Sequence, residues 1–493
     1  MGGHGGRRGG RGRLAGLWLS AGAVFGGWGN SGFAAPPPLA APSEEAFQPD
    51  LNAPQESFLD KLYRSSLLLG DMGGLRTELS KYGMSLAIQE TSEVFGNVTG
   101  GSKTGAAYDG LTQMLLQLDT NRGFGWHGGL FNASALWVHG SNLSATNLQT
   151  LQTASGIEAD RSIRLWELWY QQKFLEEDRA DIRVGQQSLD QEFMVSQNAS
   201  YLANTMFGWP VVPSYDLPGG GPAYPLSALG VRVRYRPVDQ LALLLGVFSG
   251  SPVASNTGDP QVVNASGTSF PLHQGLLVIG EIQYSYPALG SMIMADQAQP
   301  LARTYKLGFW YDTQNFDDQS LDNNGLSLAN PASNGLPLKH HGNFSIYAVA
   351  DQLVWADPHE GDRTINLFGR VTAAPQADRN LITLGINAGV TVHEPILHRD
   401  QDTLAVGIGF AKVSGADATL DKATSFFTNA YVPKRGSETY LEVSYQYQAT
   451  SWWQIQPDLQ YVFTPGGGVE NPDNPGHRIG NEVVVGLRTN ILF

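Results

Sequence analysis

The sequence predicts an all-β fold: an antiparallel outer-membrane β-barrel of about sixteen strands, preceded by a short N-terminal helical segment. Three observations carry this prediction. The first residues have the charge and apolar order of an export leader. After them, no run of roughly 18 apolar residues could form a membrane-spanning helix. From Met84 onward, apolar residues alternate with small or polar residues, which is the weak signature of membrane barrel strands.

Residues 1–34 are predicted to be a signal peptide, with cleavage after Ala34. Positive, mostly apolar and small residues follow one another in the order that the export machinery reads, which favours a leader over a disordered Gly/Arg-rich tail. The three groups are Arg7, Arg8, Arg11 and Arg13, then Leu14 to Trp28, then Gly32, Ala34 and Ala35. Residues 35–56 are predicted to be a Pro/Ala-rich periplasmic linker, 57–83 a short periplasmic helical segment, and 84–493 the transmembrane barrel.

The alternation is clearest at the C-terminus. One face of the last strand carries Val483, Val485, Leu487, Thr489, Ile491 and Phe493, and the other carries Glu482, Gly486, Arg488 and Asn490. A soluble β-sandwich or lectin also alternates, but its outer face is usually richer in charge and its strands are shorter. Here the polar face is mild and the strands are long, which favours the barrel.

Sixteen strands are expected, an even number as in bacterial barrels. Their ranges are 84–94, 111–119, 129–138, 163–174, 181–188, 227–236, 240–249, 275–286, 303–313, 342–354, 364–373, 380–391, 402–412, 437–448, 452–463 and 482–493. The connections mostly alternate between long ones, such as 95–110, 189–226 and 314–341, and short ones. Bacterial barrels have long extracellular loops and short periplasmic turns, so both termini are expected on the periplasmic side. Pro457 cannot donate to a sheet ladder, and we expect a bulge there.

Composition and motifs exclude several other functions. The chain has 493 residues, of which 15% are charged and 59 are glycine, a profile of many strands joined by Gly-rich turns. The absence of cysteine excludes disulfides and thiolate sites, and a net charge of −14 argues against a nucleic-acid partner. No catalytic or nucleotide-binding motif is present. The pairs His340–His341 and His359–Glu360 are interpreted as loop residues without a third ligand. We expect no metal and no cofactor.

Alternation also predicts which side chains face the lumen. In 164–174, Trp166, Leu168 and Tyr170 are expected to face lipid, while Glu167 and Trp169 face inward. Arginines, carboxylates and an indole together suit sugar passage, because sugar hydroxyls bind charged groups and an aromatic face can stack on a pyranose. The candidate pore-lining or substrate-binding residues are Glu167, Trp169, Asp181, Arg183, Asp190, Glu192, Arg232 and Arg234. The alternative is a charge set that only shapes the field of a general diffusion pore.

The longest connection, 189–226, contains Asp190, Glu192, Tyr201, Trp209 and Tyr215. A loop rich in aromatic residues can fold inward and narrow the pore, or it can form an extracellular cap. The sequence leaves both arrangements open.

Several segments resemble the OprB-type carbohydrate-selective porins. They are Trp166-Glu167-Leu168-Trp169-Tyr170, 183–193, Tyr224-Pro225 before Gly230-Val231-Arg232, 452–461 and the terminal Phe493. Gly70-Asp71-Met72-Gly73-Gly74-Leu75-Arg76 is also similar, although Met72 stands where that family is expected to have Trp. The resemblance spans roughly residues 57 to 493.

This resemblance implies a sixteen-stranded porin in the Gram-negative outer membrane that passes small, glucose-like carbohydrates down a gradient. Its implied partners are small carbohydrates, outer-membrane lipid and, through Phe493, the outer-membrane assembly machinery. A monomer and a homotrimer both remain open. The alternatives are a general porin or one for polyols, sugar acids or anions, then a barrel enzyme, and a secreted carbohydrate-binding β-protein.

Overall fold

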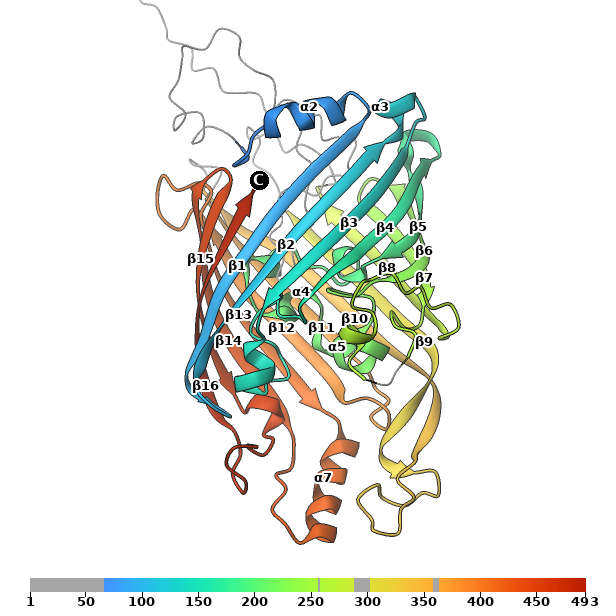
Figure 1. Ribbon diagram of the computed structural model, residues 1–493, viewed down its shortest axis with the longest axis vertical. Helices are drawn as coiled ribbons and strands as arrows, with labels where there is room; N and C mark the ends of the chain where they lie inside the picture. The colour runs from blue at the N-terminus through green and yellow to red at the C-terminus, as the bar shows by residue number, and fades with distance from the viewer. Residues whose placement is uncertain (1–65, 256–257, 288–301, 358–362) are drawn as a thin grey trace, which may run out of the picture.

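The computed structural model describes residues 66–255, 258–287, 302–357 and 363–493. Its sixteen strands form one closed antiparallel barrel in which each strand pairs with its sequence neighbours and β1 pairs with β16 (Figure 1). The strands are β1 Met84–Gly101, β2 Gly105–Asp119, β3 Gly129–Gly140, β4 Ser162–Phe174, β5 Ala180–Gln187, β6 Ala228–Val238, β7 Leu241–Ser249, β8 Leu276–Tyr286, β9 Arg303–Asp322, β10 Pro337–Ala356, β11 Thr364–Ala373, β12 Ile382–His393, β13 Thr403–Val413, β14 Ser437–Thr450, β15 Trp453–Phe463 and β16 Gly480–Leu492. The predicted fold class is confirmed.

Short helices occupy the connections. They are η3 Met72–Gly74, α2 Leu75–Ser80, α3 Thr120–Phe124, η4 Ser144–Leu148, η5 Glu176–Asp178, η6 Leu189–Gln191, η7 Ala199–Tyr201, α4 Thr205–Gly208, α5 Val211–Asp216, η8 Pro218–Gly220, α6 Pro260–Val263, α7 Gly415–Thr428 and η9 Pro465–Gly467. Within the described part of the chain, no helix has the length and apolar character needed to cross a membrane. The predicted leader, linker and His359–Glu360 lie outside the described residues.

The two ends of the barrel differ. Helix α2 and the C-terminus lie at one end, whereas α7 and the β9–β10 hairpin extend from the other (Figure 1). We call the second end the loop end, because the connections 141–161, 188–227, 250–275, 414–436 and 464–479 all leave the strands there. The opposite end has short turns such as 239–240 and 451–452.

Two predicted long loops are wrong. Strands β1 and β2 run to Gly101 and from Gly105, so most of 95–110 is paired sheet and only 102–104 connects them. Strands β9 and β10 likewise consume most of 314–341, and they place His340 and His341 within β10 instead of a loop. These extensions carry few outward apolar side chains, so the alternation that locates a membrane strand fades before the pairing ends.

The two faces of the wall separate as predicted. On β16, Val485 and Leu487 are exposed on the outer face, whereas Glu482 and Arg488 are buried on the inner face. Outward aliphatic side chains of this kind meet lipid in an outer-membrane barrel. At Pro457 the expected bulge is wrong: the residue pairs with Leu487 of β16, and the β14–β15 register is the same on both sides of it. The missing donor is accommodated by an interruption of pairing with β14 and not by an inserted residue.

Arg76 joins the segment before β1 to the last strand. The side chain is buried and donates to the carbonyl oxygens of Gly70, Leu86 and Phe493. Nearby, the Leu68 amide donates to Leu492 O at 2.8 Å and the Phe493 amide donates to Ile88 O at 2.9 Å. Residues 68–76 therefore cover the seam where β1 meets β16.

We expect Arg76→Ala to destabilise the barrel by about 1.5–3 kcal/mol, the typical contribution of a hydrogen bond to a charged group. The change should lower the temperature at which the protein loses its compact, heat-modifiable band on a gel. Lys81→Ala is the control, because Lys81 pairs with Glu78 on the exposed surface, where an ion pair contributes little. Equal melting of the two variants would contradict a role of Arg76 at the seam.

Candidate functional site

The loop 188–227 folds into the barrel, which answers the question that the sequence left open. Helices α4 and α5 lie at mid-height within the barrel (Figure 1). Its apolar side chains form one buried cluster with inward residues of β7 to β15. The Phe207 ring, for example, lies 5.8 Å from Phe368 and 5.4 Å from Tyr440, both edge-on. The lumen is thus partly filled by a hydrophobic core, and we call 188–227 the internal loop.

Small residues on the inner wall make room for this loop. A Cβ at Gly407 would lie 2.4 Å from Phe207 Cζ, and one at Gly385 would lie 2.7 Å from Val211 Cγ1. Both distances are below van der Waals contact, so larger side chains would displace the loop. The small inner face that the sequence shows on β12 and β13 is therefore a docking surface for the internal loop.

Arg370 of β11 is the main polar anchor of the internal loop. It is fully buried and donates from Nη1 to Met194 O at 2.9 Å and to Gly208 O at 2.7 Å. It also donates from Nη2 to Met206 O, while Asn387 accepts from the guanidinium at 3.1 Å. A single guanidinium thus satisfies three loop carbonyls that would otherwise be buried without a donor.

Three inward carboxylates bind the amides of the same loop. Glu281 accepts from the Met194 amide at 2.8 Å. Asp351 accepts from Ser196 Oγ at 2.6 Å and from Asn198 Nδ2 at 3.0 Å. Glu442 accepts from the amides of Ala203 and Asn204. Strands β8, β10 and β14 therefore hold the internal loop at several points along the loop by charge-assisted hydrogen bonds.

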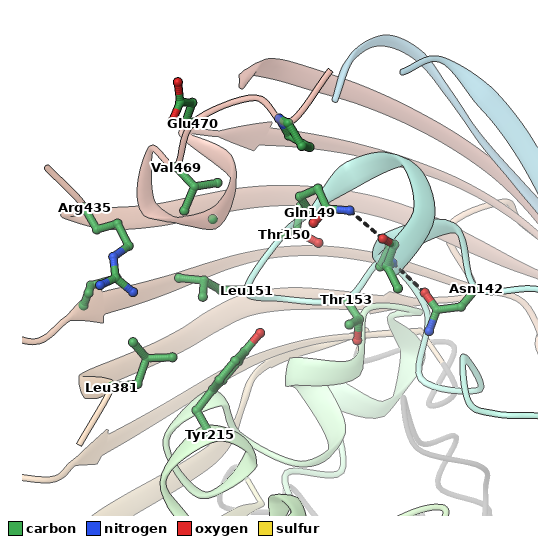
Figure 2. Close-up of a pocket in the computed structure, with 15 residues that line it drawn as sticks. Asn142, Gln149, Thr150, Leu151, Thr153, Tyr215, Leu381, Arg435, Val469 and Glu470 are labelled. Atoms are coloured by element: carbon green, nitrogen blue, oxygen red, sulfur yellow. Dashed lines mark hydrogen bonds between the residues drawn. The ribbon is translucent and has the colours of Figure 1, made fainter. Parts of the chain in front are cut away.

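The connection 141–161 also turns inward, and it forms a pocket at the loop end. The pocket encloses about 510 Å³. Figure 2 shows the side chains that surround this space, most of which come from 141–161, α5 and the connection 464–479, together with Leu381, Val413 and Arg435. We call it the mouth pocket, and its lining includes Asn142, Gln149, Leu151, Tyr215, Arg435 and Glu470.

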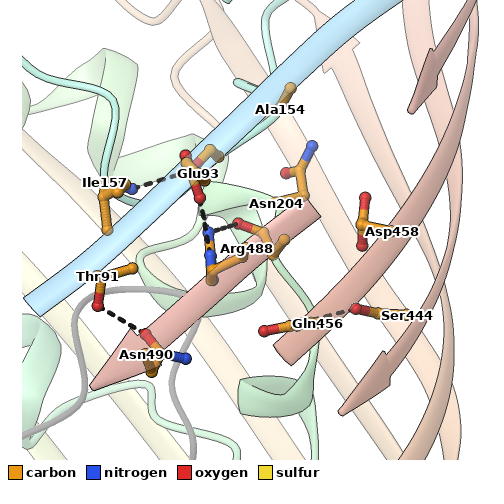
Figure 3. A network of polar contacts seen from close by, with 12 residues as sticks. Thr91, Glu93, Ala154, Ile157, Asn204, Ser444, Gln456, Asp458, Arg488 and Asn490 are labelled. Carbon is orange, nitrogen blue, oxygen red and sulfur yellow. Dashed lines mark hydrogen bonds and ion pairs between the residues drawn. The ribbon is translucent and has the colours of Figure 1, made fainter. Parts of the chain in front are cut away.

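Arg488 links this connection to the barrel seam. Its Nε donates to Glu93 on β1 at 2.8 Å, and its Nη2 donates to Ser155 Oγ at 3.0 Å (Figure 3). Ala203 O of the internal loop lies 3.5 Å from the same Nη2. Both inward connections therefore meet at one buried guanidinium on the last strand.

On the wall formed by β4, β5 and β6, one charged cluster contains five of the eight predicted site residues. The register of β5 and β6 places Asp181 opposite Arg234 and Arg183 opposite Arg232. We call the arginine cluster the six residues Gln171, Asp181, Arg183, Glu192, Arg232 and Arg234.

Hydrogen bonds connect all members of the arginine cluster. Asp181 accepts from Arg232 and, at 2.7 Å, from Arg234 Nε. Glu192 of the internal loop accepts from Arg232 Nε at 2.9 Å and lies 3.4 Å from Arg183 Nη1. Burial raises the pKa of Glu192, but the positive charges of Arg232 and Arg183 outweigh this effect and hold the pKa below its usual value. Three arginines therefore face two carboxylates, and the net charge of the cluster is 3 − 2 = +1.

The accessible part of the cluster is narrow. The side chains of Arg183 and Arg234 are 18% and 20% exposed, whereas Arg232 is buried. Trp169 is only 7% exposed, and the Arg183 guanidinium lies over its ring at 4.1 Å. Arg183 thus covers the indole face that we expected to stack on a sugar. Trp169 instead positions Arg183 through a cation–π contact.

Glu167 and Asp190 stabilise the start of the internal loop, to which their hydrogen bonds go, instead of joining the hydrogen bonds of the arginine cluster. Glu167 accepts from the Ser188 amide at 3.1 Å. Asp190 accepts from Ser188 Oγ at 2.6 Å and from the Tyr224 amide at 3.0 Å, and burial raises its pKa. Both carboxylates hold backbone and hydroxyl groups of the loop, and both are buried.

The lipid-facing prediction for Trp166 is wrong. Ser134 pairs with Glu167 and Ala135 pairs with Leu165, so Trp166 is an extra residue in a bulge. It is buried and lies edge-on to Tyr224 at 6.4 Å. Leu168, beyond the bulge, is exposed on the outer face as predicted.

The inward residues that hold the internal loop are Glu281, Asp351, Arg370, Glu442 and Arg488, and none of them was among the predicted site residues. The same is true of Glu438, which holds the connections 141–161 and 464–479. Each of these six residues lies on the inward face of its strand, where most other residues are small, polar or apolar. A charged residue in the inward phase was the signal that could have identified them. Within the described ranges, no cluster of His, Cys, Asp and Glu could hold a metal ion.

A closed barrel with an apolar outside and a charged, partly filled lumen defines a channel of the outer membrane. Residues 103–493 match the family described as carbohydrate-selective porin, OprB family. The chain belongs to this family and is a carbohydrate porin, a channel rather than an enzyme, with small carbohydrates as its substrates.

Similar proteins agree with this assignment. Porin B of Pseudomonas aeruginosa is 24% identical over 479 residues, which cover 92% of this chain and 94% of that protein. The putative porin QuiX of Acinetobacter baylyi is 22% identical over 440 residues, covering 82% and 90%. The high-pH structure of Pseudomonas putida OprB superposes with a TM-score of 0.74 at 24% identity, covering 87% of this chain and 98% of that one. At this identity the structural likeness shows the fold alone.

Proposed function

We propose that the channel passes glucose-like monosaccharides passively into the periplasm, without catalysis, along the wall that carries the arginine cluster. The observation that carries this proposal is the charge pairing of the cluster. Arg183, Arg232 and Arg234 are held by Asp181, Glu192 and Gln171, so their field is largely balanced. A balanced surface with remaining donors suits neutral solutes rich in hydroxyl groups, and its contacts are weak enough to release them.

The remaining charge supports one alternative. A net charge of +1 on the cluster favours anions over cations, so sugar acids are the second candidate. Neutral sugars fit better, because binding an anion gains most from arginines that are free of carboxylate partners.

Other partners follow from the barrel. We propose that the exposed aliphatic band contacts outer-membrane lipid, and that the assembly machinery recognises the last strand through Phe493 before the seam closes. The homotrimer stays a prediction, and chemical crosslinking in native outer membranes would test it.

Liposome swelling tests the proposed function. Proteoliposomes should swell faster in glucose than in glutamine, a neutral amino acid of similar size, and faster in glucose than in gluconate. Equal rates for glucose and glutamine would contradict sugar selectivity, and faster entry of gluconate would favour the sugar-acid alternative. No swelling in any solute would contradict a pore that is open to monosaccharides.

A further inference from the structure

We propose that the mouth pocket is an outer binding site that holds a neutral pyranose against the ring of Tyr215 before the sugar reaches the arginine cluster. This inference rests on the proposed sugar passage and adds a second, separate site to it. Tyr215 lies on α5, and 39% of the residue is exposed. An exposed aromatic ring in a concave site offers the apolar surface that the C–H face of a sugar ring needs.

The rest of the lining matches the two faces of a sugar. Leu151 and Leu381 supply apolar surface near Tyr215, and Val469 supplies it on the other side of the pocket (Figure 2). Among the described residues, the Tyr215 hydroxyl and Arg435 Nη1 have no hydrogen-bond partner, so both can serve a ligand. The volume of about 510 Å³ falls in the range of small-molecule sites, roughly 300–1,000 Å³.

The walls of the pocket are fixed to one another. Glu438 accepts from the Leu151 and Gln152 amides at 2.8 Å each, and from the Gly466 amide at 2.7 Å. One buried carboxylate therefore joins the connection 141–161 to the connection 464–479. On the third side, Asp216, next to Tyr215, accepts from the Ile382 amide at 3.2 Å. A pocket held in this way does not have to be ordered by its ligand.

The local charges favour a neutral ligand. Arg435 already binds Asp417 at 3.0 Å and Asp421 at 2.9 Å. Glu470 adds a third carboxylate, whose Oε1 accepts from the Gly476 amide at 2.6 Å. Within the lining, the charges of Arg435 and Glu470 balance, and Arg435 is already paired with two carboxylates, so an anion gains little there. Hydroxyl groups, by contrast, can both donate to Glu470 and accept from Arg435.

The pocket is distinct from the arginine cluster. Its lining belongs to α5, to the end of β13 and to connections at the loop end, whereas the cluster lies on β4, β5, β6 and the start of the internal loop. The internal loop contributes to both sites, with Tyr215 at the pocket and Glu192 at the cluster.

A fluorescent reporter tests the inference directly. The chain has no cysteine, so Ala145→Cys, at an exposed position of the lining, gives a single labelling site in the full-length protein in detergent micelles. Titration with D-glucose should change the fluorescence saturably. Adding Tyr215→Leu should raise the apparent Kd at least about fivefold, which corresponds to about 1 kcal/mol, whereas Tyr215→Phe should keep it within about twofold.

Tyr431→Leu is the matched control, because Tyr431 is an exposed tyrosine at the loop end outside the pocket lining. Sorbitol, which has no ring, should titrate weakly and respond little to Tyr215→Leu. The proposal would be overturned if glucose caused no saturable fluorescence change in the labelled protein that carries Ala145→Cys alone. It would also be overturned if Tyr215→Leu and Tyr431→Leu gave the same Kd. Saturable binding without glucose swelling would overturn the proposed sugar passage instead, and swelling without saturable binding would overturn only the pocket.

Discussion

Replacing Arg370 by alanine is expected to raise single-channel conductance severalfold and to abolish the preference for glucose over glutamine. The substitution removes the donors to Met194 O, Met206 O and Gly208 O. Three buried acceptors without donors cost at least about 3 kcal/mol, which is a large share of the free energy that holds a loop in place. Planar-bilayer recording and proteoliposome swelling measure the two effects.

Two variants serve as controls for Arg370→Ala. Val371→Ala changes the next residue, which faces outward, and should leave conductance unchanged. Arg370→Lys keeps the charge but not the planar fork that reaches several carbonyls, so an intermediate conductance is expected. Wild-type conductance in Arg370→Ala would show that Glu281, Asp351 and Glu442 hold the loop without Arg370.

The double variant Arg232→Ala with Arg234→Ala is expected to shift ion preference from anions toward cations. It changes the arginine cluster from three arginines and two carboxylates to one arginine and two carboxylates, so the net charge goes from +1 to 1 − 2 = −1. The field of charges that line a pore determines which ion enters. The reversal potential in a KCl gradient should change sign or move clearly toward the cation limit.

Arg232 is buried between Asp181 and Glu192, and removal of a buried partner is strongly destabilising, by about 3–5 kcal/mol. Arg234→Ala alone therefore provides a second measurement, with a smaller shift in the same direction. Arg179→Ala is the control, since Arg179 pairs with Glu177 and Asp239 at the end of the barrel opposite the loop end. A reversal potential that stays unchanged in both the double variant and Arg234→Ala would place the ion path away from the cluster.

The sequence predicts the wall better than its contents. Alternation identifies every strand because lipid imposes an apolar outer face, and the same alternation turns Asp181, Arg183, Arg232 and Arg234 inward. It fails at Trp166, because a bulge depends on pairing with Ser134 and Ala135 of another strand. A periodic pattern within one segment carries no information on such an insertion.

The internal loop shows a different limit. Phe193, Met206, Phe207 and Val212 have no strand or long-helix period, so their pattern predicts no element. Their apolar character was informative, since an extracellular cap exposed to water would carry fewer such residues. Which inner wall they contact, and which charges hold them, depends on residues far away in the sequence, such as Arg370 and Glu442.

The filled lumen also constrains how the protein is assembled. The internal loop contacts Glu442 on β14, more than two hundred residues later, and Arg488 on the strand that closes the barrel. Before closure, the chain presents two sets of apolar side chains, one for lipid and one for the interior, and the membrane alone does not distinguish them. The charged residues along the inner wall make that distinction, because a strand bearing Arg370 or Glu442 can leave water only with its partner loop in place.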